Sequence, residues 1–171
     1  HLHAALQRRL FSYLFKSEPT LILTTHSPHI AAVAPLDAFV VLRESGSGTV
    51  ARTSAGLDIS EERRTDLERY MNVSRAEILF APIVILVEGA AETYIVPALA
   101  RAFGFDLDSF GVLVASVDGV DFEPWIDLLG DDSLDIPHLV ITDGDADADT
   151  QGRTEAGLRR GAKLLPALGL V

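Results

Sequence analysis

Two apolar stretches, 83-IVILVEGAAE-92 and 139-LVITDGD-145, decide the fold of this chain, because each of them ends abruptly in carboxylates. The first has the composition of a buried strand and stops on Glu88, with Glu92 shortly after it. The second stops on Asp143 and Asp145. In open parallel sheets, ligands bind beyond the carboxyl ends of the strands. Together the two stretches predict a divalent-metal site at that edge of a sheet.

The sequence around these stretches predicts a regular alternation of strands and helices after Pro82. The predicted strands are 83–87, 111–117 and 138–142, and the helices that follow them are at about 91–103, 122–129 and 153–165. Such an order is typical of an α/β fold, in which helices flank a parallel sheet. Gly104 is predicted to cap the first of these helices.

The first half of the chain carries local signals for helices, one strand and a hairpin. The predicted elements are a helix at 2–15, a strand at 20–25, a short helix at 28–33 and hairpin strands at 38–42 and 49–53. Ser60 precedes four charged residues, which predicts an N-capped helix. Apolar residues are sparse over 60–80, so this stretch is predicted to be a connecting segment.

The composition limits the class of protein. The chain has 171 residues, 48% of them hydrophobic, so it can bury a sizeable core. It lacks cysteine, a membrane-length apolar run and a signal-peptide pattern, which together predict a cytoplasmic protein without a membrane partner. Both ends look cut from a longer polypeptide. The net charge of −11 argues against a nucleic-acid surface unless bound cations neutralise part of it.

Each acidic motif alone also has an ordinary structural interpretation. A Glu after a strand often stabilises the N-terminus of the next helix, and Asp-Gly-Asp is a common turn. Two such motifs at strand ends of one sheet favour a metal site. Carboxylates suit Mg²⁺ or Mn²⁺, and two ions about 3.5–4 Å apart are the usual arrangement for phosphoryl displacement.

Two other metal sites are excluded by their own patterns. The stretch from Asp143 imitates a calcium-binding EF-hand loop, but that loop needs Gly at its sixth position and Glu at its twelfth. Here these positions are Ala148 and Thr154, and a strand precedes the loop in place of a helix. An aspartyl-phosphate phosphatase would leave Glu88 and Glu92 unexplained.

The spacing of LVEGAAE and ITDGD resembles that of a Toprim domain, the metal-binding domain of topoisomerases, bacterial-type primases and several nucleases. The doubled motif Glu88-Gly-x-x-Glu92 is similar to the variant in nucleases of the overcoming lysogenization defect (OLD) family. The resemblance implies that Glu88 is a catalytic acid/base or a metal ligand. It also implies that Asp143, Asp145 and Glu92 bind metal.

The segment LILTTHSP, residues 21–28, resembles the switch segment of ABC-type ATPases. The resemblance implies that His26 contacts the γ-phosphate of ATP in an intact ATPase. His1-Leu2-His3 resembles the stretch after the Walker B acids of the same enzymes. No phosphate-loop motif occurs in the chain, so we expect this chain alone not to hydrolyse ATP.

These resemblances predict three parts: the end of an ABC-type ATPase domain at 1–57, a helical linker at 58–81 and a Toprim nuclease domain at 82–171. The predicted function is that of a metal-dependent DNA endonuclease or nickase coupled to the ATPase, with DNA and a second copy of the protein, held through the ATPase part, as partners. The alternatives are a non-catalytic Toprim module of an SMC-like DNA-repair ATPase and a fragment of a primase or topoisomerase.

Overall fold

The computed structural model describes residues 3–17, 20–46, 48–119 and 121–142 of the chain. Backbone contacts divide the chain into two compact units. Unit 1 comprises His1–Ala81 together with Asp131–Asp135, and unit 2 comprises Pro82–Gly130 and Ile136–Val171. Residues 131–135 therefore interrupt unit 2 in the sequence, and the chain returns to unit 2 at Ile136.

Unit 1 begins with two helices that pack against each other. Helix α1 (Ala4–Lys16) confirms the predicted first helix; the ring of His3 accepts the Ala5 N–H at its start, and Ser17 caps its end. Helix α2 (Pro28–Ala31) begins at the predicted proline and is followed by the short 3₁₀ helix η1 (Leu36–Ala38). Ser27 Oγ donates to Gln7 Oε1 at 3.0 Å, which ties the start of α2 to α1.

The predicted strand at 20–25 is wrong, because these residues have no regular secondary structure. Their composition suits a buried strand, but Ile22 is 94% exposed. A strand forms only where a neighbouring strand supplies its hydrogen bonds. Within the described ranges, the sheets are β1–β2 and β4-β3-β5, and neither pairs with this segment.

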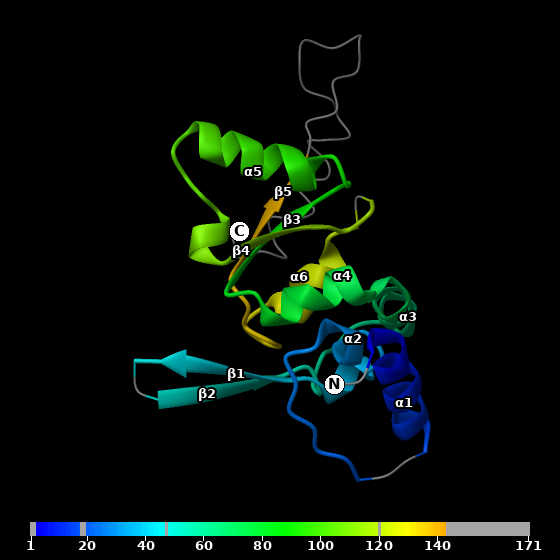
Figure 1. The fold of residues 1–171 in the computed structure, drawn as a ribbon. Helices are drawn as coiled ribbons and strands as arrows, with labels where there is room; N and C mark the ends of the chain where they lie inside the picture. The colour runs from blue at the N-terminus through cyan, green and yellow to red at the C-terminus, as the bar shows by residue number, and fades with distance from the viewer. Residues whose placement is uncertain (1–2, 18–19, 47, 120, 143–171) are drawn as a thin grey trace. The chain divides into compact units, whose positions relative to one another are not determined.

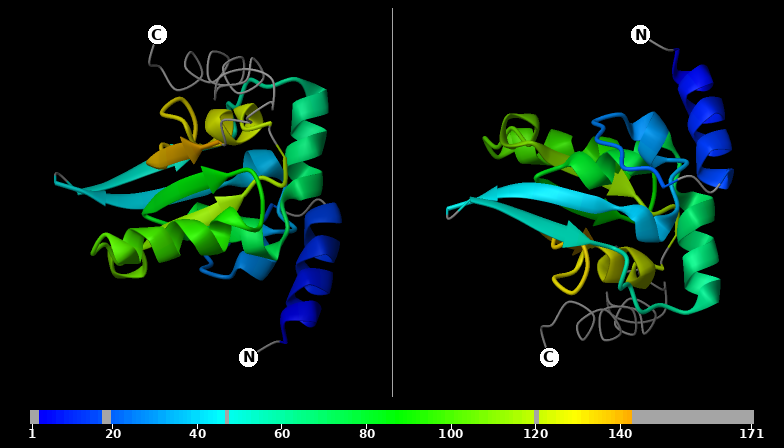
Figure 2. Two further views of the ribbon diagram at one scale, coloured as in Figure 1. Left: turned by 90° about the horizontal axis from the view of Figure 1, so that it is seen from above. Right: turned by 90° about the horizontal axis from the view of Figure 1, so that it is seen from below.

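The predicted hairpin is confirmed. Strands β1 (Val40–Ser45) and β2 (Gly48–Thr53) pair antiparallel, with Val40 opposite Thr53 at one end and Ser45 opposite Gly48 at the other. They form a two-stranded ribbon (Figure 2). Every residue of β2 is exposed, so the described surroundings of the hairpin leave it largely open to solvent.

The segment predicted as a linker contributes apolar side chains to the core. It forms α3 (Glu61–Tyr70), α4 (Val73–Ala76) and the 3₁₀ helix η2 (Glu77–Phe80). Ser60 caps α3 as predicted, because its hydroxyl accepts the Arg63 N–H at 3.3 Å. Leu67 and Ile78 are each 1% exposed, which makes the segment part of the packed interior.

Unit 2 contains the predicted parallel sheet, and its order is confirmed (Figure 1). The strands are β3 (Ile83–Val87), β4 (Val112–Ser116) and β5 (His138–Ile141), and they lie in the order β4-β3-β5. Helices α5 (Glu92–Ala102) and α6 (Glu123–Leu129) make the two crossovers and flank the sheet. The helix predicted at 153–165 lies outside the described residues.

The central position of β3 explains its unbroken apolar sequence. Val84, Leu86 and Val87 are fully buried and Ile85 is 9% exposed, because a middle strand is covered on both faces.

Among the helices that the structure describes, α6 has the most buried residues. They are Pro124, Trp125, Ile126, Leu128 and Leu129.

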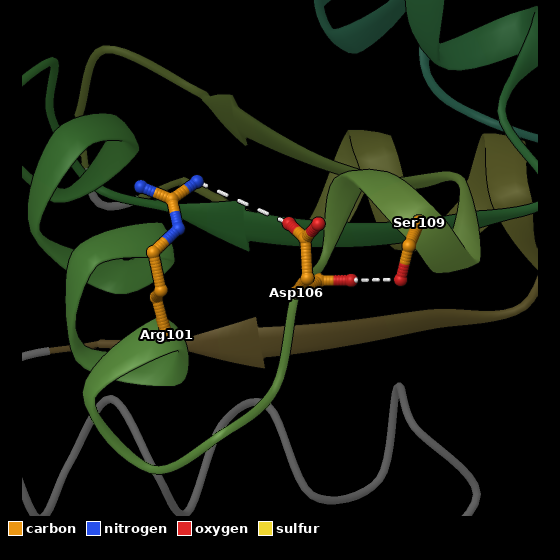
Figure 3. Close-up of polar contacts among 3 residues, drawn as sticks. All are labelled: Arg101, Asp106 and Ser109. Atoms are coloured by element: carbon orange, nitrogen blue, oxygen red, sulfur yellow. Dashed lines mark hydrogen bonds and ion pairs between the residues drawn. The ribbon is translucent and has the colours of Figure 1, made fainter.

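The connection from α5 to β4 is held by local polar contacts (Figure 3). Gly104, with φ +85°, follows the last turn of α5 and donates its N–H to Arg101 O at 3.0 Å, so the predicted cap is confirmed. Arg101 Nη2 lies 3.9 Å from Asp106 Oδ1, and Ser109 Oγ donates to Asp106 O at 2.7 Å.

Among the helices of the described ranges, none is long and apolar enough to cross a membrane.

Candidate metal centre at the carboxyl edge of the sheet

The ends of β3 and β5 meet at the carboxyl edge of the sheet. The two strands are parallel, and their last paired residues are Val87 and Ile141. The next residues, Glu88 and Thr142, therefore face each other. Thr142 Oγ1 donates a hydrogen bond to Glu88 Oε1, so the contact joins the side chains as well as the strands.

Strand β4 holds the backbone of Glu88 from the opposite side. Gly119 N–H donates to Glu88 O at 2.9 Å, and Ser116 Oγ lies 3.2 Å from the same carbonyl oxygen. Ser116 Oγ also lies 2.7 Å from Asp118 Oδ1 and accepts the Asp118 N–H at 3.0 Å. Asp118 has a φ of 54°, a left-handed conformation that turns the chain sharply out of the strand. Both neighbouring strands thus fix Glu88.

Glu92 lies in the first turn of α5 and points back to the end of β3. Its Oε2 accepts the Gly89 N–H at 3.1 Å, which satisfies a backbone donor next to the helix start. A Cβ atom at position 89 would lie only 3.1 Å from the same oxygen. Glycine at this position therefore lets Glu92 approach the backbone. Glu88 and Glu92 are both half-buried.

The structure places two of the four predicted metal ligands. Glu88 directly follows β3, and Glu92, four residues later, is held near the same strand end by its hydrogen bond from the Gly89 N–H. Asp143 and Asp145 lie outside the described residues, but Thr142, directly before Asp143, contacts Glu88. Within the ranges that the structure describes, no three His, Cys, Asp or Glu side chains gather closely enough to hold a metal ion.

The donors present fit a hard divalent cation. Two carboxylates at the open edge of a sheet offer the oxygen ligands that Mg²⁺ and Mn²⁺ prefer. A complete protein site needs a third or fourth carboxylate. Thr142 lies at this edge, and Asp143-Gly144-Asp145 follow it in the sequence. The chemistry of the donor set is therefore compatible with the predicted metal centre.

Sequence reasoning missed the hydroxyl groups around Glu88. Thr142 lies within the ITDGD stretch but was given no role there, and Ser116 belongs to no motif, since a Thr or Ser at a strand end is common. The bend at Asp118-Gly119 after β4 also holds Glu88, because the Gly119 N–H donates to Glu88 O. The signal that could have revealed Thr142 is its register, because the first residues after two paired parallel strands lie side by side.

His26 lies in unit 1, in the extended segment before α2. The segment turns at Ser27, whose N–H donates to Thr25 Oγ1 at 3.0 Å. The His26 ring is exposed and its centroid lies 6.2 Å from that of Phe80. The contact of His26 with ATP stays a prediction.

Comparison with known proteins assigns the part of the chain that carries this edge. Residues 79–145 match the family model described as "Overcoming lysogenization defect protein-like, TOPRIM domain". Residues 79–145, called the Toprim segment below, are therefore similar to the Toprim domain of OLD-like proteins. The match contains β3, β4 and β5 and both acidic motifs, so the predicted Toprim-like α/β fold is confirmed for this part of the chain.

The chain is also similar to individual proteins. The uncharacterized protein YbjD of Escherichia coli (strain K12) is 29% identical over 126 residues, which cover 72% of this chain and 22% of that protein. The chain thus spans about a fifth of that relative. The C-terminal region of the Burkholderia pseudomallei OLD protein is 42% identical, with 50% of this chain and 43% of that chain covered and a TM-score of 0.41. The corresponding region from Xanthomonas campestris pv. campestris is 40% identical, with 54% and 40% covered and a TM-score of 0.45.

Proposed function

We propose that the Toprim segment is the nuclease part of an ATPase-coupled protein and hydrolyses DNA phosphodiesters with divalent metal ions. The observation that supports this most is the contact of Glu88 with Thr142. It brings the first acidic motif to the residue that directly precedes the second. Glu88 and Thr142 thereby meet at the edge where parallel sheets bind their ligands, and the second motif follows Thr142 in the sequence.

Glu88, Glu92, Asp143 and Asp145 would hold Mg²⁺ or Mn²⁺ in this proposal. When bound, the metal ions supply positive charge that activates water and stabilises the leaving oxygen. In the hydrolysis a water oxygen forms a bond to phosphorus, the bond from phosphorus to the leaving oxygen breaks, and that oxygen takes up a proton. Glu88, fixed by β4 and β5, is placed to assist the proton transfer.

The charge distribution supports a requirement for cations. Residues 82–171 contain sixteen acidic and five basic side chains, whereas residues 1–81 contain nine of each. The Toprim segment and its C-terminal extension therefore carry the whole net charge of −11. Phosphate groups approach such a surface only where cations offset its charge.

The ATPase part of the proposal rests on residues 1–57. Here His26 would contact the γ-phosphate of ATP in the intact protein, and two copies would associate through their ATPase domains. Helices α1 and α2 hold the His26 segment through the Ser27–Gln7 hydrogen bond. DNA is the proposed substrate of the nuclease part, and ATP is the proposed cofactor of the ATPase part.

The proposal is tested with Asp143→Ala in the intact protein. We expect this change to abolish Mg²⁺- or Mn²⁺-dependent nicking of supercoiled plasmid, because a carboxylate ligand is lost. Asp131→Ala is the matched control, since Asp131 is exposed and belongs to the 131–135 segment of unit 1. Full nicking by the Asp143→Ala variant would contradict the proposed metal-dependent nuclease.

A non-catalytic Toprim module is the second candidate. The hydrogen bond from Gly89 N–H to Glu92 gives that carboxylate a structural role that needs no metal. Calorimetry with Mn²⁺ separates the two candidates, because the nuclease must bind the ion and the module need not. Absence of Mn²⁺ binding by the intact wild-type protein favours the module.

A further inference from the structure

We propose that Thr142 is a positioning residue of the metal centre, which holds the Glu88 carboxylate in its metal-binding orientation. This inference rests on the proposed metal-dependent function and goes beyond its four acidic residues. Two observations point to Thr142 independently of each other. The register of β3 and β5 places it opposite Glu88, and its hydroxyl donates to Glu88 Oε1.

A glutamate at a strand end needs such a partner. Its side chain has three rotatable bonds, so an unrestrained carboxylate samples many orientations and loses this freedom when it binds a metal. The backbone of Glu88 is already fixed by Ser116, at the end of β4, and by Gly119, shortly after β4. Thr142, directly after β5, fixes the carboxylate itself. Backbone and side chain are therefore held from opposite sides of β3.

Threonine suits this position for two physical reasons. Its branched Cβ restricts χ1, which aims the hydroxyl in few directions, and it favours the extended backbone at the end of a strand. A hydroxyl donor can also orient a carboxylate without adding a charge that competes with the metal. Partners of metal ligands act in this way, and their loss typically lowers metal affinity or activity by about 10–100-fold.

The test compares Thr142→Val with Thr142→Ser in the intact protein. Valine keeps the branched shape and removes the donor, whereas serine keeps the donor. We expect Thr142→Val to raise the Mn²⁺ dissociation constant, measured by calorimetry, about tenfold or more. Thr142→Ser should stay within about threefold of wild type. Nicking by Thr142→Val should fall at limiting Mn²⁺ and recover largely at saturating Mn²⁺.

Thr53→Val is the matched control, because Thr53 also ends a strand and donates its hydroxyl, here to Phe39 O at 3.1 Å in unit 1. The Thr53 hydroxyl also accepts the Ala55 N–H at 3.2 Å, so the variant reports the change in thermal stability that the loss of the whole hydroxyl causes. Its Mn²⁺ affinity should equal that of wild type. If Thr142→Val does not fold, Thr142→Ala takes its place with the same expected shift in affinity.

The possible outcomes separate the two proposals. Wild-type Mn²⁺ affinity in a folded Thr142→Val variant overturns the role of Thr142 and leaves the nuclease proposal standing. A wild-type protein that binds Mn²⁺ without nicking DNA contradicts the nuclease proposal, and the role of Thr142 is then judged by affinity alone. A wild-type protein that does not bind Mn²⁺ overturns both.

Discussion

At the scale of single residues, Gly89 controls how closely Glu92 can approach the backbone at the end of β3. Its N–H donates to Glu92 Oε2 at 3.1 Å, and the space where a Cβ would stand is bounded by the same oxygen, also at 3.1 Å. A side chain at position 89 would displace the Glu92 carboxylate. The absence of a side chain at Gly89 therefore helps to determine the position of the Glu92 carboxylate.

Gly89→Ala should weaken Mn²⁺ binding about tenfold, the scale on which metal sites respond to changes next to a ligand. The added methyl group pushes Glu92 away, and we expect the free energy of unfolding to change by less than about 1 kcal/mol. Calorimetry and urea unfolding measure the two effects. Gly56→Ala is the control, because a Cβ there meets nothing within 4 Å. Unchanged Mn²⁺ affinity in Gly89→Ala would contradict this role of Gly89.

Gly111 is needed for a different reason, which concerns stability. It has a φ of +67° and its added Cβ would lie 3.1 Å from Pro82 Cγ. Gly111→Ala should lower the free energy of unfolding by about 1–3 kcal/mol, because a non-glycine residue is strained in this conformation. Urea unfolding checks this value against Gly56→Ala, and a loss no greater than in that control would contradict it.

At the scale of elements, helix α3 depends on its cap. Ser60 accepts the Arg63 N–H, and Glu61 and Glu62 follow in the first turn, where they face the positive end of the helix dipole. The helix packs through Leu67, which is 1% exposed. A loss at its start therefore weakens a buried contact of unit 1.

Ser60→Ala should destabilise the protein by about 1 kcal/mol, the usual cost of removing an N-cap hydroxyl. Thr65→Ala, on an exposed position of the same helix, should be neutral or slightly stabilising because alanine is the better helix former. Thermal or urea unfolding compares the two variants. Equal effects from both would mean that the cap contributes nothing specific.

Elements with local signals could be predicted from the sequence, and those that depend on distant partners could not. The Ser60 cap, the hairpin and the alternation from β3 to β5 are confirmed, because caps, turns and apolar periodicity are encoded in neighbouring residues. The prediction of a strand at 20–25 was wrong, because strand pairing needs a second segment that composition does not reveal. The same distinction holds at the site. Glu88 could be predicted from its position after an apolar strand, whereas the contact of Thr142 with Glu88 depends on the register of β5 with β3.

At the scale of the whole molecule, charge is divided unevenly along the chain. All of the net charge of −11 belongs to residues 82–171. Self-repulsion in such a segment opposes folding, and a divalent cation bound at the carboxyl edge offsets it more strongly than sodium does. Cations should therefore stabilise this protein selectively.

Saturating Mg²⁺, at about 100 times its dissociation constant, should stabilise the protein by about 2.7 kcal/mol. This corresponds to a rise in Tm of about 5–10 °C for a protein of this size. Differential scanning fluorimetry compares Mg²⁺ with NaCl of equal ionic strength. The rise should shrink to the NaCl value in a Glu88→Gln, Glu92→Gln double variant, and an equal rise with both salts in the wild type would contradict specific binding.

The contact between Glu88 and Thr142 also sets an order of folding events. The two residues are 54 positions apart, and the chain passes through 131–135 of unit 1 before β5 begins. Contacts of long sequence separation form late, because closing a long loop costs entropy before the contact repays it. A nascent chain can thus pair β3 with β4 while Glu88 still lacks its partner hydroxyl. Among the described residues, we expect the contact at the carboxyl edge of the sheet to form late, after β3 and β4 have paired.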